Sequence, residues 1–83
     1  MIDWRLQQSW AGIIHSLVYG GEWDGIPVQM LIHTPKRGDE FGKQRGYYYI
    51  IGINKEFRSE DDLIDAVEVL DKVTKKRLRR MAG

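Results

Sequence analysis

The chain has 83 residues, 30% of them charged, and its 13 lysines and arginines nearly balance 12 aspartates and glutamates. This length allows one small domain over residues 1–83, and the net charge of +1 argues against wholesale electrostatic binding of nucleic acid. The sequence contains no cysteine, which excludes disulfide bonds and thiolate zinc sites.

The N-terminal segment, residues 3–21, is predicted to form a helix. Its larger apolar residues fall on one face at about 100° per residue, and these are Leu6, Trp10, Ile13, Ile14 and Leu17. A strand fits less well, because the polar residue Ser16 would then share a face with Trp10. Asp3 suits an N-cap, and the glycine pair at residues 20–21 supplies a left-handed stop.

The dipeptide Asp24-Gly25 predicts a type I′ turn, since both central positions of that turn need a positive φ. The turn would join a very short strand through Trp23 to a longer strand over residues 26–34. One face of the longer strand is apolar and consists of Ile26, Val28, Met30 and Ile32. Pro27 fits the start of this strand, and Pro35 is expected to end it.

A loop over residues 36–46 and a second strand over residues 47–53 follow. The loop has mixed charge and is longer than the usual hairpin connection, which is typical of functional loops. The strand is aromatic and β-branched. Alternation places Tyr47 and Tyr49 on one face, which we assign to the core. The opposite face then carries Tyr48 and Ile50.

The C-terminal segment from Ser59 onward predicts one long helix. Ser59 is its N-cap, and Asp62 completes a capping-box pattern with an acidic residue at the usual glutamate position. A single apolar stripe runs along this helix, made of Leu63, Ala66, Val67, Leu70, Val73, Thr74, Leu78 and Met81.

Together these elements predict an α+β fold of order α-β-β-β-α, in which an N-terminal and a C-terminal helix flank a small antiparallel sheet of two or three strands. Leu31, Tyr48 and Ile50 are expected on the reverse face of this sheet, where solvated positions would be polar. The candidate residues for a dimer or partner interface are Leu31, Tyr48, Ile50, Trp4 and Trp23. Pairing of identical patches predicts a homodimer with Tyr48 near its centre.

Two basic segments are candidates for nucleic-acid contact. The loop contributes Lys36, Arg37, Lys43 and Arg45, and the end of the C-terminal helix contributes Lys75, Lys76, Arg79 and Arg80. We favour a simpler explanation for each segment: the loop is a solvated segment of mixed charge, and the basic helix end interacts with the dipole of its own helix.

No motif for catalysis, metal binding or cofactor binding stands out. His15 and His33 are the only histidines, and no spacing of carboxylates near them indicates a metal site. No segment has the signal-peptide pattern or the roughly 18 apolar residues of a membrane span. We therefore expect a cytoplasmic protein that has no enzyme activity, no metal, no cofactor and no membrane association.

The favoured hypothesis is a self-associating interaction protein that binds an unidentified protein or other macromolecule. In general style such small domains resemble accessory proteins of phages or mobile elements. The alternatives are nucleic-acid binding through the two basic segments and small-molecule binding in an aromatic pocket.

Overall fold

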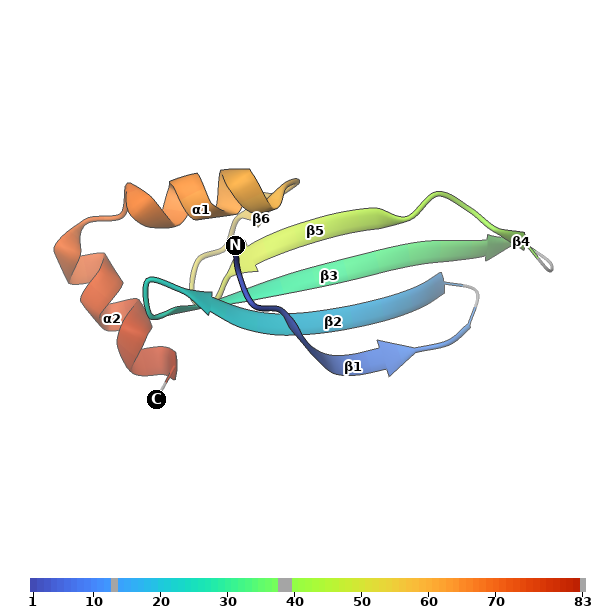
Figure 1. Cartoon of the computed structure of the whole chain (residues 1–83), viewed down its shortest axis with the longest axis horizontal. Helices are drawn as coiled ribbons and strands as arrows, with labels where there is room; N and C mark the ends of the chain where they lie inside the picture. Colours follow the sequence, from blue (N-terminus) through green and yellow to red (C-terminus); the bar gives the residue numbers. More distant parts are fainter. Residues whose placement is uncertain (13, 38–39, 83) are drawn as a thin grey trace.

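The structure is a computed structural model that describes residues 1–12, 14–37 and 40–82, except for the side chains of Arg37 and Ala82. Six antiparallel strands form one sheet, and two helices follow it (Figure 1). The elements are β1 (Arg5–Trp10), β2 (Ile14–Trp23), β3 (Ile26–Arg37), β4 (Glu40–Phe41), β5 (Arg45–Ile50), β6 (Glu56–Phe57), α1 (Glu60–Glu68) and α2 (Lys72–Ala82). The strand order is β1-β2-β3-β5-β6, and β4 pairs with the end of β3.

The predicted α-β-β-β-α fold is wrong, because the N-terminal segment forms β1 and β2 instead of a helix. The β-branched and aromatic residues of β2 favour a strand, and a bulge between Leu6 and Gln8 shifts the phase of β1. All six residues of β1 are exposed. Trp10 ends β1 and Ser16 lies opposite it in β2, so alternation within a single strand does not apply to this pair. Ile13, a member of the predicted apolar helix face, lies outside the described residues.

The turn between β2 and β3 confirms the prediction from Asp24-Gly25. Both residues have positive φ, 52° and 74°, and Trp23 pairs with Ile26 across the turn. The strand before the turn is ten residues long instead of very short. Pro27 lies near the start of β3, as predicted, but Pro35 lies inside β3 and does not end it.

The pairing of β3 with β5 decides which side of the sheet faces the core. Val28 lies opposite Ile50, and Met30 lies opposite Tyr48. Residues directly opposite each other share a face, so Ile50 and Tyr48 lie on the side of Val28. The predicted alternation within β5 is therefore correct, but the predicted faces are exchanged, and Tyr47 points away from the core.

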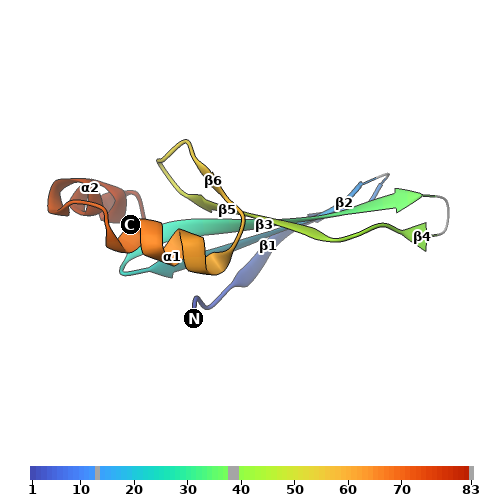
Figure 2. The same ribbon diagram turned by 90° about the horizontal axis from the view of Figure 1, so that it is seen from above.

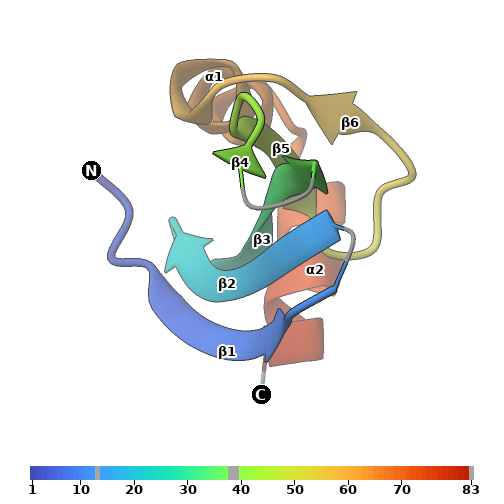
Figure 3. The same ribbon diagram turned by 90° about the vertical axis from the view of Figure 1, so that its right-hand side faces the viewer.

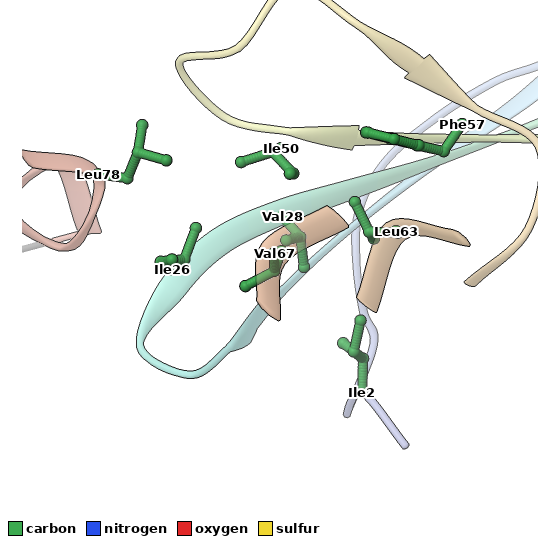
Figure 4. Close-up of a cluster of buried hydrophobic side chains, with 8 residues drawn as sticks. All are labelled: Ile2, Ile26, Val28, Ile50, Phe57, Leu63, Val67 and Leu78. Carbon is green, nitrogen blue, oxygen red and sulfur yellow. The ribbon is translucent and has the colours of Figure 1, made fainter. Parts of the chain in front are cut away.

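The core lies at one end of the sheet, between the strands and the helices (Figure 4). It combines side chains from the N-terminal segment, β3, β5, β6 and both helices, namely Ile2, Ile26, Val28, Ile50, Phe57, Leu63, Val67 and Leu78. Leu63, Val67 and Leu78 are 0% exposed. These three members of the predicted apolar stripe therefore pack as expected.

The predicted single C-terminal helix is two helices. α1 ends at Glu68, and α2 begins after Asp71, whose carboxylate accepts a hydrogen bond from the Thr74 N–H at 2.7 Å. An aspartate in this position satisfies a first-turn N–H and favours the start of a new helix. The break changes the direction of the stripe, so that Val73 and Met81 are 80% and 55% exposed.

Ser59 caps α1 as predicted, since its Oγ accepts a hydrogen bond from the Asp62 N–H at 3.1 Å. Ser59→Ala removes this acceptor and is expected to lower the free energy of unfolding by about 1 kcal/mol. Urea denaturation measures the change. Ser59→Asp keeps an acceptor and should retain the stability, whereas an unchanged Ser59→Ala variant would contradict the cap.

The molecule is elongated, with extents of 48 × 23 × 22 Å. Both helices lie at one end and β4 lies at the other (Figure 1). Figure 2 shows α2 beyond the ends of the strands, and Figure 3 shows the curvature of the sheet. In the described part of the chain, no helix combines the length and the apolar character needed to cross a membrane.

Candidate functional site

The half of the sheet farthest from the helices has no helix on either face (Figures 1 and 2). It comprises β1, β4 and the parts of β2, β3 and β5 that lie beyond the core. The side that carries Val28, Ile50 and α1 is termed the helix face, and the opposite side is termed the open face. Their different side chains suggest different roles.

An apolar patch continues from the core along the helix face. It consists of Leu6, Leu17, Tyr19, Met30 and Ile32. Tyr19 pairs with both Leu6 and Met30, and Leu17 pairs with Ile32, so the register holds the patch together. Leu6 is 56% exposed and the other four are partly exposed. Because Met30 also pairs with Tyr48, which packs against the core, patch and core form one continuous apolar strip.

The open face carries aromatic, basic, polar and aliphatic side chains in two neighbouring cross-strand rows. One row consists of Trp10, Ser16, His33 and Arg45, and the next consists of Gln8, Val18, Leu31 and Tyr47. Trp10 is 52% exposed and Ile14, beside the first row, is 51% exposed. This face is therefore mixed in chemistry, unlike the apolar patch.

Tyr47, the side chains that contact it and the aromatic and basic side chains of the two rows are termed the open-face site. The guanidinium of Arg58 lies 4.7 Å from the centroid of the Tyr47 ring, and the His33 ring packs edge-on with centroids 5.6 Å apart. Glu56 orients Arg58 through an ion pair of 3.4 Å between Nη1 and Oε2. Burial and a hydrogen bond to Glu56 raise the pKa of the neighbouring Tyr49 above its ordinary value of 10.0.

A shallow depression of about 500 Å³ lies beside the Tyr47 ring. It is lined by Ile14, His33, Pro35, Gly42, Lys43, Arg45 and Tyr47. Among the described residues, neither Lys43 nor Arg45 forms an ion pair. Both cations border the depression, where an anionic ligand would meet them.

The predicted interface residues do not share one surface. Ile50 belongs to the core, with 2% of its surface exposed. Three others pack against the core, namely Trp4, Trp23 and Tyr48. The Trp4 indole N–H also donates to Glu60 Oε1 at 2.6 Å. Leu31 lies on the open face, whereas Tyr48 lies on the helix face. The predicted dimer centred at Tyr48 needs both residues on one surface, and the sheet does not provide that surface. Small-molecule binding in an aromatic pocket stays a prediction.

The predicted loop is largely a hairpin in which β4 pairs with the end of β3. It brings Lys43 and Arg45 together at the open-face depression. Lys36 lies on the helix face instead, with its Nζ 5.9 Å from the centroid of the Phe41 ring. The side chain of Arg37 lies outside the described residues.

The basic end of α2 lies at the opposite end of the molecule from this hairpin (Figure 1), so the two segments cannot form one surface. Two of its cations hold the β2–β3 turn. Lys75 Nζ lies 3.3 Å from Asp24 Oδ2, and Arg79 Nη2 lies 2.9 Å from Asp24 Oδ1. Arg79 also donates to the Asp24 carbonyl at 2.8 Å. Lys76 and Arg80 are exposed on α2.

The ion pairs at the turn predict a pH dependence of stability. The hydrogen bond from Lys75, with a further contribution from Arg79, holds the pKa of Asp24 below its ordinary value of 3.8. A carboxylate whose pKa is lowered by folding stabilises the protein above 3.8, and this contribution disappears as pH falls through the folded-state pKa. Asp24→Asn, which tolerates a positive φ, should therefore melt at a lower temperature than the wild type at pH 7.

The difference between the two melting temperatures should shrink in acid, where Asp24 is protonated in both the folded and the unfolded state. Thermal melts monitored by circular dichroism across this range measure it. A difference that stays constant from neutral to strongly acidic pH would contradict the ionic role of Asp24.

Sequence reasoning missed most of the open-face site. Trp10 and Tyr47 are predicted core residues that the structure turns outward, and His33 and Arg58 had no signal of their own. The available signal was the alternation of β5, which places Arg45 and Tyr47 on the same side. The pairing with β3 turns that side away from the helices, and sequence spacing does not specify such a pairing.

Within the described residues, no group of three or more histidine, aspartate or glutamate side chains could hold a metal ion. Comparisons with models of protein families, with curated proteins and with solved structures gave no significant match. The apolar patch and the open face are therefore the features that bear on function.

Proposed function

We propose that the protein is a non-enzymatic interaction protein that self-associates and binds a macromolecular partner. The apolar patch is the observation that carries this proposal, because it extends the core onto an uncovered part of the sheet. Exposed apolar patches that are contiguous usually mark interaction sites. We also propose that the protein acts in the cytoplasm, in line with a sequence that contains no cysteine.

A second copy of the chain is the occupant that we propose for the apolar patch. None of the five patch residues is charged, so identical patches can meet without like-charge repulsion. Two-fold pairing, the commonest symmetry of dimers, would bring the Leu17–Ile32 pair of one protomer onto the same pair of its partner. A chain of 83 residues has a small core of its own, and the added burial would stabilise it.

Light scattering at high micromolar concentration tests the self-association. The wild type is expected to have twice the mass of the chain, and Leu17→Glu is expected to be monomeric because two carboxylates would meet in the interface. Leu31→Glu makes the same kind of change on the open face and should remain dimeric. A monomeric wild type, or a dimeric Leu17→Glu variant, would contradict the proposed interface.

A further inference from the structure

The open face combines aromatic rings with cations in the arrangement that single-stranded nucleic acids require. Bases stack on exposed aromatic side chains, while basic side chains follow the phosphates. Here Trp10 and Tyr47 supply rings in adjacent rows, and Lys43 and Arg45 lie beside Tyr47 at the depression. We propose that this face binds single-stranded RNA. This inference rests on the proposed interaction role and names the partner.

The Tyr47 ring is already held in position for stacking. Arg58 lies over the ring, and Glu56 fixes Arg58 in turn. Arg58 does not line the depression, whereas Tyr47 and His33 do. A base that enters the depression would contact Tyr47 beside His33, and little side-chain freedom is lost when it stacks.

The phosphates of the same strand would lie along Lys43 and Arg45. These two cations border the depression, so a base on Tyr47 would place its own or the next phosphate beside them. The acidic first turn of α1, residues 60–62, belongs to the helix face and does not oppose an anion here. Glu56, which accepts a hydrogen bond from Tyr49, is paired with Arg58, and Glu40 lies opposite Arg37 on the hairpin. The border of the depression, which carries Lys43 and Arg45, is therefore complementary in charge to a polynucleotide.

Neutral polar side chains around the rings favour RNA over DNA. Gln8 and Ser16 lie in the two rows, and Gln29 lies opposite Tyr49 on the same face. They provide donors and acceptors for a ribose 2′-hydroxyl, which DNA lacks. A duplex does not fit this face, because its bases are stacked on one another and cannot reach Tyr47.

Fluorescence anisotropy with a labelled, U-rich single-stranded RNA of about ten nucleotides tests the proposal. Tyr47→Ala is expected to weaken binding by about ten-fold or more, from the usual contribution of one stacked base, whereas Tyr47→Phe should bind like the wild type. Arg45→Ala should weaken binding and lower the slope of the logarithm of affinity against the logarithm of salt concentration by about one. Both side chains lie outside the core, and circular dichroism verifies that the variants are folded.

Lys76→Ala and Arg80→Ala are the matched controls, because both remove an exposed cation from α2 at the far end of the molecule. They should bind RNA like the wild type, and a loss equal to that of Arg45→Ala would overturn the proposed surface. Equal affinity for a DNA strand of the same sequence, or for an RNA duplex, would overturn the assignment to single-stranded RNA.

The experiments can contradict the proposed self-association and the proposed RNA binding independently of each other. A folded dimer that does not bind the RNA would overturn the inference about the open face and leave the proposed self-association intact. A monomer that binds the RNA and loses it in Tyr47→Ala would overturn the dimer and support the RNA surface.

Discussion

Ile50→Glu is expected to unfold the protein, whereas Leu31→Glu is expected to leave it folded. Ile50 is 2% exposed and packs between the sheet and the helices. A carboxylate there loses its hydration without gaining a partner, which costs several kcal/mol. The stability of a small domain is about 5–15 kcal/mol in total. Leu31 lies on the open face, where a carboxylate keeps contact with water.

This pair of variants tests the pairing of β3 with β5, because the sequence alone predicts that Leu31 and Ile50 share a face. Far-ultraviolet circular dichroism at 25 °C and a thermal melt distinguish the folded from the unfolded variant. A folded Ile50→Glu variant would show that Val28 and Ile50 are not opposite each other, and that the helices cover other residues.

Gly21→Ala is expected to lower the free energy of unfolding by about 1–3 kcal/mol, the usual cost of overpacking. A Cβ at this position would lie 2.8 Å from Ile2 Cγ2 and 3.2 Å from the Asp3 carbonyl oxygen. The N-terminal segment crosses the helix face here and delivers Ile2, 3% exposed, to the core. Displacing it would also disturb the hydrogen bond from Trp4 to Glu60.

Gly12→Ala is the matched control for this substitution. Apart from the chain neighbours of Gly12, the described atom nearest to a Cβ there is the Ile14 carbonyl oxygen at 4.0 Å, so the added methyl group meets no close neighbour among the described residues. Chemical denaturation of both variants gives the comparison. Equal stability of Gly12→Ala and Gly21→Ala would mean that the N-terminal segment does not pass over Gly21.

Features with a local chemical cause could be predicted from the sequence. The Asp24-Gly25 turn requires two positive φ angles, and the Ser59 cap requires one side-chain acceptor, so a few neighbouring residues determine each. The helix break at Asp71 is also local, but the apolar stripe over the whole segment concealed it. Apolar spacing is compatible with either one helix or two.

Features that depend on distant partners could not be predicted. The N-terminal segment shows a helical spacing of apolar residues, yet β2 is stabilised by pairing with β3, and β1 pairs with β2 and has no buried face. The open-face site depends in the same way on the pairing of β3 with β5. Lys43 and Arg45 were identified from charge alone, whereas Tyr47 and Trp10 became surface residues only through the sheet.

The central claim is that one uncovered face of the sheet pairs with a second copy of the chain and that the other face binds RNA. Sedimentation velocity tests both parts of this claim together. The wild-type protein is mixed at high micromolar concentration with the labelled single-stranded RNA, and the label is followed during the run. The expected result is that the label sediments with a protein dimer. Label that sediments as free RNA, or with a single protein chain, would contradict the claim.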